Sequence, residues 1–341
     1  MKSRVTATAY IEYKTLEHKD YSIHYFVSGN PNNNTIVFIH PAFGDHTCFN
    51  KQIDFFSSEY RVITLDMLGH GLSELGKSKD KIISTSTHIA KILDQEEIDK
   101  AHIVGVSLGS LIAQDFALRY SNRTFSVTVL GGYNINQEQK EIAKAQNQEI
   151  FKWLFKMLFS MDAFRRYIAE TCVVGKDEQM LFYQSTKHFT RNSFRAMSGM
   201  GKLVKERPYI KNTYPILILV GDQDIPIAIS SAQQWAQAQA NSQFYIIKNA
   251  GHCANLDNAE RFNQLLMDFV KERNSSNSSW QFQRFPSSTE KRFLLHSKRV
   301  RIFMLSSTNF HHIHAEKYCS NNRREWNDCT GIIGKTCAKR L

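Results

Sequence analysis

The sequence predicts an α/β protein built on a mostly parallel sheet with helices on both faces. Between residues 21 and 248, short β-branched or apolar runs alternate with stretches of helical spacing. Right-handed crossovers between parallel strands produce this pattern. Runs such as TIVFIH and ILILV are apolar at nearly every position, which is typical of strands that helices cover on both faces. We expect about eight strands and an inserted helical cap.

The composition excludes several other classes. The chain has 341 residues, of which 42% are hydrophobic and 22% are charged. It therefore has enough apolar material for a large core and is not disordered from end to end. No apolar run approaches the roughly 18 to 20 residues that span a bilayer. No apolar segment follows the basic residues of the start, MKSRVTATAY, so we expect a soluble, cytoplasmic protein without a membrane span.

Seven strands and two helices can be placed by their patterns. The strands are expected at residues 21–27, 35–40, 61–67, 102–106, 126–130, 215–220 and 243–247. Two apolar stripes have the spacing of a helix face that packs on a sheet. One stripe comprises Leu108, Leu111, Ile112 and Phe116, and the other comprises Phe262, Leu265, Leu266, Phe269 and Val270.

The longest gap in this alternation lies between the strands that end at 130 and begin at 215. About 80 residues separate them, far more than one crossover needs, so we expect an insertion. Its middle, EIFKWLFKMLFSMDAF, has little polar face, which is typical of a helix buried on more than one side. The sequence therefore predicts a core formed by residues 1–134 and 214–273 and a helical cap formed by residues 135–213.

Residues 274–341 differ in character from the rest of the chain. They begin NSSNSS and carry 12 Lys and Arg against 4 Asp and Glu, a net charge of +8, whereas the preceding residues carry 31 against 28, a net charge of +3. No nucleic-acid-binding module is recognisable among the basic residues, so we expect no nucleic-acid partner. The intervals between Cys319, Cys329 and Cys337 match no usual zinc spacing. We interpret this segment as a basic tail that is disordered or not native to the fold.

The pentapeptide GVSLG at residues 105–109 lies between a predicted strand and a predicted helix. In that context a G-x-S-x-G sequence forms a sharp turn that lifts the serine hydroxyl out of the sheet, and the two glycines relieve the crowding. The turn also places the hydroxyl at the positive end of the helix, where a developing anion is favoured. Ser107 is therefore a candidate nucleophile.

A serine hydroxyl needs a general base, and the base needs a partner that orients it. Two segments further along the chain offer these groups. Asp222 and Asp224 follow the strand at 215–220, and His252 follows the strand at 243–247. Because the carboxyl ends of parallel strands meet at one edge of a sheet, we expect these side chains at the same edge as Ser107.

The order of serine, acid and histidine, together with two further motifs, resembles the α/β-hydrolase family. HPAFG at residues 40–44 is similar to the family's H-G-x-x-G oxyanion loop, and DMLGHGLS at residues 66–73 is similar to its D-x-x-G-x-G-x-S turn. Four spaced motifs in the family's order are far more specific than any one alone. The resemblance extends from about residue 21 to 273, and it implies an α/β-hydrolase fold with an inserted helical cap.

The resemblance also implies roles for individual residues. Ser107 would be the nucleophile, His252 the base and Asp224 the orienting acid, because Asp224 occupies the last position of the family's G-x-x-D pattern. Asp222 is the rival acid, and its other interpretation is a carboxylate that caps its own turn. His40 and His70 belong to the turn motifs, and we expect them to brace loops by hydrogen bonding.

The oxyanion would be held by the backbone amides of Ala42 and Leu108. Pro41 stands where the family usually has Gly, and because proline lacks an N–H and restricts φ, the path of this loop is in doubt. The substitution does not remove the expected donor, because Ala42, the next residue, keeps its backbone N–H. An apolar substrate pocket is expected to include Phe43, Trp153, Phe155 and Met157.

These observations favour a serine hydrolase that cleaves an ester, thioester, lactone or related acyl bond of a small, partly apolar substrate. The reaction would pass through an acyl-enzyme intermediate and would need no cofactor and no metal ion. The fold also hosts aminopeptidases, carbon–carbon bond hydrolases and small-molecule receptors with little turnover, and these alternatives remain open. The expected partner is a small-molecule acyl substrate, and the oligomeric state is left open.

Overall fold

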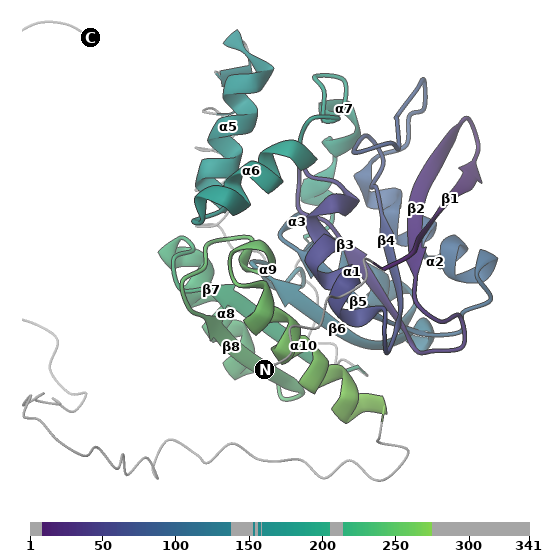
Figure 1. Cartoon of the computed structure of the whole chain (residues 1–341), viewed down its shortest axis with the longest axis vertical. Helices are drawn as coiled ribbons and strands as arrows, with labels where there is room; N and C mark the ends of the chain where they lie inside the picture. Colours follow the sequence, from purple (N-terminus) through teal and green to yellow (C-terminus); the bar gives the residue numbers. More distant parts are fainter. Residues whose placement is uncertain (1–8, 138–152, 154–155, 158, 205–213, 275–341) are drawn as a thin grey trace, which may run out of the picture. The chain divides into compact units, whose positions relative to one another are not determined.

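The computed structural model describes residues 9–137, 153, 156–157, 159–204 and 214–274, and it confirms the predicted fold class. Eight strands form one sheet in the order β1-β2-β4-β3-β5-β6-β7-β8 (Figure 1). β2 is antiparallel to both of its neighbours, and all other pairs are parallel. The strands are β1 (Ile11–His18), β2 (Tyr21–Ser28), β3 (Thr35–Ile39), β4 (Arg61–Leu65), β5 (Ala101–Val106), β6 (Thr124–Leu130), β7 (Ile216–Gly221) and β8 (Ser242–Ile247).

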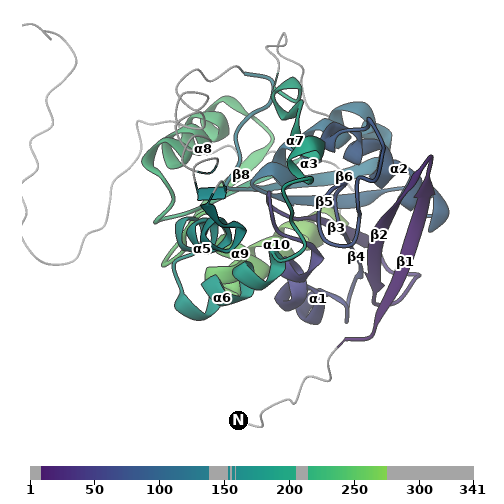
Figure 2. The same ribbon diagram turned by 90° about the horizontal axis from the view of Figure 1, so that it is seen from above.

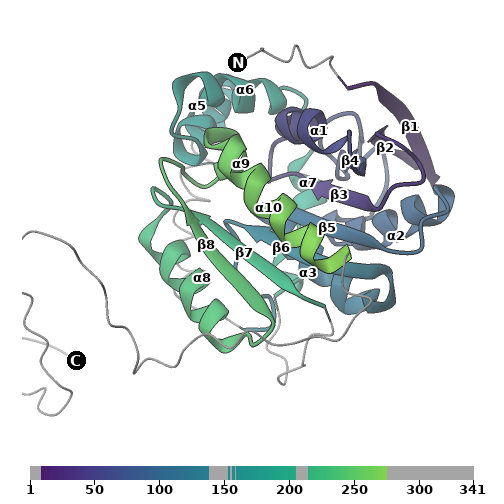
Figure 3. The same ribbon diagram turned by 60° about the horizontal axis from the view of Figure 1, so that its bottom comes forward.

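Helices cover both faces of this sheet, as expected. Figure 2 shows α2, α3 and α8 on one face and α1 and α10 on the other, and Figure 3 shows α10 crossing in front of the strands. The helices are α1 (Asn50–Phe56), α2 (Thr85–Gln95), α3 (Leu108–Arg119), α5 (Met161–Cys172), α6 (Lys176–Ser185), α7 (Phe194–Met197), α8 (Pro226–Ala238), α9 (Ala254–Asp257) and α10 (Ala259–Asn274). Short 3-10 turns are η1 (His46–Phe49), η2 (Ile82–Ser84), η3 (Ser121–Arg123) and η4 (Met200–Lys202).

The apolar patterns that predicted these elements are buried where the prediction requires. Every residue of β3, β4, β5 and β7 is buried, because helices shield both faces of these strands. The stripes of α3 and α10 are buried as well, and Ile112, Phe116, Phe262, Leu266 and Val270 have no exposed surface. Hydrophobic burial on both faces therefore fixes the central strands from which the site residues emerge.

One strand, β1, was not predicted. It pairs with β2 along its whole length, from Ile11 opposite Ser28 to His18 opposite Tyr21. As an edge strand it exposes Ile11 and Tyr13 to solvent, so its apolar positions do not form the continuous run that revealed the central strands.

The predicted insertion lies between β6 and β7 and contains α5, α6, α7 and η4. Figure 1 shows α5 and α6 above the carboxyl ends of the parallel strands. Gln114 of α3 ties the start of the insertion to the core, because its side-chain amide donates to the carbonyl of Tyr133 at 2.9 Å and accepts from the amide of Ile135 at 3.2 Å. The boundaries at 134 and 214 stay a prediction, and residues 275–341 of the predicted tail lie outside the described residues.

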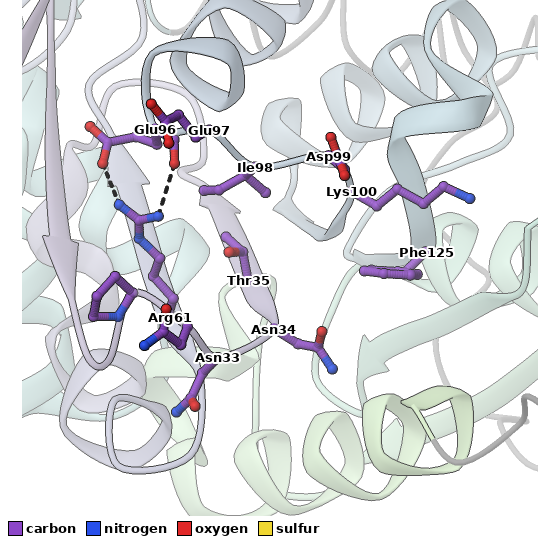
Figure 4. A pocket seen from close by; sticks show the side chains of 12 residues that line it. Asn33, Asn34, Thr35, Arg61, Glu96, Glu97, Ile98, Asp99, Lys100 and Phe125 are labelled. Atoms are coloured by element: carbon purple, nitrogen blue, oxygen red, sulfur yellow. Dashed lines mark hydrogen bonds and ion pairs between the residues drawn. The ribbon is translucent and has the colours of Figure 1, made fainter.

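A buried ion pair closes the opposite edge of the sheet, where the parallel strands begin. The Arg61 guanidinium at the start of β4 donates to the carboxylate of Glu96 and, at 3.1 Å, to its carbonyl (Figure 4). The Glu96 carboxylate also accepts from Tyr25 Oη at 2.5 Å and from Lys14 Nζ at 3.0 Å. The side chains of Arg61 and Glu96 are only 10% and 4% exposed.

Replacement of this carboxylate tests its contribution to stability. We expect Glu96→Gln to lower the free energy of unfolding by about 3 kcal/mol, because it leaves the buried Arg61 charge uncompensated. Urea denaturation followed by circular dichroism measures the change.

Glu59→Gln is the matched control. It breaks the ion pair between Glu59 and Lys271, whose side chains are 50% and 52% exposed, and solvent-exposed pairs contribute at most about 1 kcal/mol. Equal losses in the two variants would mean that the Arg61 pair is no more important to stability than a surface contact.

Candidate active site

The three side chains expected to act together emerge from one edge of the sheet. Ser107 follows β5, Asp224 follows β7 and His252 lies between β8 and α9. These strands run parallel, so their carboxyl ends meet at a common edge. Ligands and reactive groups gather at that edge in open α/β sheets.

The backbone at Ser107 has the sharp turn that the motif predicts. Its φ of 53° and ψ of −116° place it in a region that serine rarely occupies. The flanking glycines make the turn possible, because a Cβ on Gly105 would lie 2.1 Å from the carbonyl oxygen of Gly109. A Cβ on Gly109 would lie 2.1 Å from the carbonyl oxygen of Ile39 in β3. The Ser107 amide is held by the carbonyl of Leu130 in β6 at 2.8 Å.

A continuous chain of hydrogen bonds joins the three side chains. His252 Nε2 lies 2.8 Å from Ser107 Oγ, and His252 Nδ1 lies 2.9 Å from Asp224 Oδ2. Nδ1–H donates to the carboxylate, which leaves Nε2 free to accept the serine proton. Asp224 Oδ1 accepts from the amide of Ile225 at 2.8 Å, so both carboxylate oxygens are engaged.

The surroundings of His252 favour its charged form. Burial alone would lower the pKa of the imidazole, but the charge and hydrogen bond of Asp224 outweigh that effect and raise the pKa to about 9. The Asp224 side chain is only 3% exposed, whereas that of His252 is 26% exposed. Gly131 makes room for the ring, because a Cβ at this position would lie 3.0 Å from His252 Nδ1.

Asp222, the rival acid, lies in a different environment. Its Oδ1 accepts a hydrogen bond from the amide of Ala250 at 3.2 Å, and its Oδ2 lies 3.6 Å from Lys248 Nζ. The carboxylate thus joins the turn after β7 to the turn after β8, and Asp224, not Asp222, hydrogen-bonds to His252.

The loop after β3 carries the first of the two expected oxyanion donors. Within the described residues, neither the amide of Ala42 nor that of Leu108 has a hydrogen-bond acceptor. The imidazole of His40 holds the loop, because its Nδ1–H donates to the Pro41 carbonyl at 2.7 Å while its Nε2 accepts from the amide of Met67 at 3.0 Å. This bonding pattern requires a neutral ring, and burial lowers the pKa of His40 accordingly.

The neighbouring turn after β4 is organised by Asp66. Its buried carboxylate accepts from the amides of His46 and Leu72, both at 2.8 Å. Gly71 has a φ of +50°, and a Cβ there would lie 2.2 Å from the Asp66 carboxylate. His70 is fully buried, its Nδ1 lies 3.3 Å from the Leu68 carbonyl, and burial lowers its pKa to about 3.

Aromatic side chains from the insertion surround Phe43, one residue after Ala42. The ring of Phe43 is 3% exposed and lies 5.1 Å from the ring of Trp153. Trp153 and Met157 are partly buried and pack against the core, whereas Phe155 lies outside the described residues. Edge-to-face or tilted contacts join Phe43 to three further rings, those of Phe164, Phe189 and Phe194.

These last three aromatics were not among the predicted site residues. Phe189 lies between helices in a stretch without periodic apolar spacing, so no pattern in the sequence marked it. Phe164 belongs to the apolar run that predicted the cap, but the run did not indicate which ring meets the loop after β3. A fourth residue that the sequence did not reveal is Asp257, which contacts the insertion and the loop of His252.

A polar pocket at the opposite edge of the sheet is separate from this site. Its volume is about 560 Å³, and it lies between the loop that enters β3 and the loop that enters β5 (Figure 4). Its lining includes Thr35, Arg61 and Lys100, which stand at or before the first residues of their strands. It includes none of the residues that follow the carboxyl ends, so we do not assign the reaction to it.

Membrane-spanning helices and clusters of metal-binding side chains are both absent from the described residues. Within the described residues, no helix is both long and apolar enough to cross a membrane. The same part of the chain contains no group of three or more His, Cys, Asp or Glu side chains arranged to hold a metal ion.

Known proteins with similar sequences are hydrolases and an acyltransferase component. A 2-hydroxy-6-oxononadienedioate/2-hydroxy-6-oxononatrienedioate hydrolase of Paraburkholderia phymatum is 26% identical over 73% of this chain and 90% of its own length. The 3-oxoadipate enol-lactonase 1 of Acinetobacter baylyi is 26% identical over 72% of this chain and 91% of its own length. The acetyltransferase component of the acetoin cleaving system of Cupriavidus necator is 25% identical over 68% of this chain and 62% of its own length.

Solved structures share the fold. A carboxylesterase of Nitrososphaera gargenis superposes with a TM-score of 0.66 at 16% identity and covers 76% of this chain and 99% of its own. The enol-lactonase of Burkholderia xenovorans gives a TM-score of 0.62 at 18% identity, covering 76% of this chain and 100% of its own. The sequence profile of the alpha/beta hydrolase family matches residues 36–265. Because this match includes more than half of the chain, the protein belongs to the alpha/beta hydrolase family of enzymes.

Proposed function

We propose that this protein is a serine hydrolase that cleaves an ester, thioester, lactone or related acyl bond, with Ser107, His252 and Asp224 as its catalytic triad. The observation that carries the proposal is the hydrogen-bond chain from Ser107 Oγ through the imidazole to Asp224 Oδ2, with distances of 2.8 and 2.9 Å. A nucleophile, a base and an orienting acid in mutual contact form the arrangement that acyl transfer requires.

The chemistry follows from the proton positions. His252 Nε2 removes the proton of Ser107 as the oxygen attacks the substrate carbonyl, and the imidazolium is stabilised by the negative charge of Asp224. The same proton then passes to the leaving group, which departs and leaves an acyl group on Ser107. Water, deprotonated by His252, attacks this ester, the acyl group departs as a carboxylic acid, and the proton passes from His252 to Ser107 Oγ. Every proton that His252 accepts is returned, so the cycle needs no cofactor.

The developing oxyanion needs donors placed before the reaction begins. We assign this role to the backbone amides of Ala42 and Leu108, since each lacks an acceptor among the described residues. Leu108 is the first residue of α3, so its amide is also at the positive end of the helix. Such donors each contribute roughly 3 kcal/mol to transition-state stabilisation.

The substrate is inferred to be small and partly apolar. Phe43 directly follows Ala42, the ring of Trp153 lies 5.1 Å from the ring of Phe43, and Met157 of the insertion packs against the core. We propose that these side chains form the apolar wall beside the acyl group and that the insertion acts as the cap over the site. The similarity to a 3-oxoadipate enol-lactonase and to a 2-hydroxy-6-oxononadienedioate/2-hydroxy-6-oxononatrienedioate hydrolase is consistent with a small substrate.

Carbon–carbon bond hydrolysis is the second candidate. It is favoured by the similarity to the 2-hydroxy-6-oxononadienedioate hydrolases, which are 26% and 23% identical to this chain. A substrate panel separates the two functions. Turnover of acyl esters and lactones supports the first proposal, whereas turnover confined to vinylogous diketones supports the second.

Removal of the nucleophile is the direct test. We expect Ser107→Ala to lower kcat for a short p-nitrophenyl ester at least about a thousand-fold, because no other side chain in the triad can form the acyl-enzyme. Alanine at position 107 keeps the Cβ that the turn already accommodates. The circular dichroism spectrum and the melting temperature of the variant should therefore stay close to those of the wild type. Undiminished turnover by the variant would contradict the assignment of Ser107.

The pH dependence tests the base and its partner. Because only neutral His252 accepts a proton, kcat/KM should rise with pH through a midpoint near 9, the pKa to which Asp224 raises it. Removal of the carboxylate charge by Asp224→Asn leaves burial as the main influence, so the pKa of His252 should fall below 6.5. Initial rates corrected for spontaneous ester hydrolysis measure the wild-type profile, and NMR titration of the His252 ring measures the pKa in the variant.

His252→Gln provides the assignment control for that titration, since its spectrum lacks the His252 signal. An Asp224→Asn variant whose His252 still titrates near 9 would show that a different group supplies the charge.

A further inference from the structure

The insertion rests on the loop that carries His252 at one junction, between α5 and α6. The segment of the insertion involved is Cys172–Gly175, and the segment of the core is Gly251–Asp257. The Cys253 amide donates to the Cys172 carbonyl at 2.9 Å. A Cβ on Gly251 would lie 3.2 Å from that same carbonyl oxygen and 3.2 Å from Val174 Cγ2. The two backbones are therefore in direct contact beside the proposed base.

The carboxylate of Asp257 binds both sides of this junction at once. Its Oδ1 accepts from the amides of Val174 and Gly175 in the insertion, each at 2.9 Å. Its Oδ2 accepts from the amide of Gly251, also at 2.9 Å. Gly251 directly precedes His252, so one carboxylate joins the insertion to the residue next to the proposed base.

The core holds the His252 loop at Asn255. The contacts of the insertion are at the other end of the loop, near Gly251. The Gln52 side chain of α1 donates to the Asn255 carbonyl at 3.1 Å, and the Asn255 side chain donates to the Cys48 carbonyl at 3.1 Å. Both Gln52 and Asn255 are buried. The loop thus has a fixed anchor after residue 254 and a second anchor, made by Asp257, before residue 252.

We propose that Asp257 is a positioning residue that makes the orientation of His252 depend on the contact between the insertion, at residues 172–175, and the His252 loop. The inference rests on the proposed function, since it assigns His252 the role of base. If the segment from Cys172 to Gly175 moves away, Oδ1 loses two amides and the Cys172 carbonyl releases Cys253. The backbone on both sides of His252 is then less constrained, and the 2.8 Å contact between Nε2 and Ser107 Oγ is loosened.

A carboxylate suits this position because it is acceptor-only. Three amides from two directions need two acceptor oxygens, and the side chain of Asn offers one oxygen and a donor group in place of the other. Asp257→Asn therefore keeps the shape of the side chain but can serve only one side of the junction. A misplacement of about 1 Å at a reacting group costs about a hundred-fold in rate.

The experiment measures kinetics and backbone protection in the same variants of the full chain. For a p-nitrophenyl ester, Asp257→Asn should lower kcat between about ten-fold and a hundred-fold with KM within two-fold of wild type. Asp257→Glu keeps both oxygens and should recover part of kcat. Hydrogen exchange followed by mass spectrometry should show faster exchange in peptides covering residues 172–176 and 250–254 in Asp257→Asn.

A second variant acts from the insertion alone. Val174→Pro removes one of the two amides that bind Oδ1 and leaves the sequence of the His252 loop unchanged. Val173 has the extended backbone, with φ of −134° and ψ of 137°, that a residue before proline adopts. We expect kcat to fall here too, and peptides covering residues 250–254 to exchange faster.

Asp80→Asn is the matched control. The Asp80 carboxylate accepts from Lys19 Nζ at 2.9 Å and from Tyr21 Oη at 2.8 Å, and it contacts neither the insertion nor the His252 loop. Its loss should lower the melting temperature without changing kcat. A fall in kcat for Asp257→Asn no larger than that of Asp80→Asn, or a change confined to KM, overturns the proposal.

The exchange measurement separates this proposal from the proposed function. If the wild-type protein hydrolyses none of the substrates, the proposed function fails, and the exchange of residues 250–254 still decides whether Asp257 holds that loop. Unchanged exchange there in both Asp257→Asn and Val174→Pro overturns the coupling, whatever the activity.

Discussion

The unusual backbone at Ser107 is the constraint on which the neighbouring architecture depends. A non-glycine residue held at a φ of 53° costs of order 1 to 3 kcal/mol, so its surroundings must enforce it. Close packing of Gly105 against the Gly109 carbonyl, and of Gly109 against the Ile39 carbonyl, does so. The bond from the Ser107 amide to Leu130 adds a third support. Strands β3, β5 and β6 are thereby locked to the first turn of α3 at a single point.

The parts of the fold that the sequence predicted are those with local signals. Buried central strands are apolar runs, and the segment 105–109 carries its own glycine spacing, so each was recognisable without knowledge of its neighbours. The resemblance to a family then related Ser107, Asp224 and His252, which lie up to 145 positions apart in the chain. β1 was missed because an edge strand exposes much of its apolar surface, and a half-exposed pattern is ambiguous.

The contacts of the insertion could not be predicted for a different physical reason. Asp257 bonds to residues 82 and 83 positions away, and all of its partners are backbone amides, which every residue other than proline has. No residue type marks such partners in a sequence. In the same way, Phe43 was a candidate pocket residue, but its contacts with Phe164, Phe189 and Phe194 depend on how two helices of the insertion, α5 and α7, and the segment between α6 and α7 fold back on the loop after β3.

The rings around Phe43 limit how selectivity can change in this protein. Phe43 has a φ of 73° and directly follows the loop residue whose amide is assigned to the oxyanion, while its ring is enclosed by the insertion. An exchange of Phe189 or Phe194 that reshapes the space for a new substrate therefore also shifts the support of that amide. A new substrate specificity would consequently require paired substitutions, one in the insertion and one in the loop that carries Phe43. A single substitution would change substrate selectivity but would also lower the rate of the reaction.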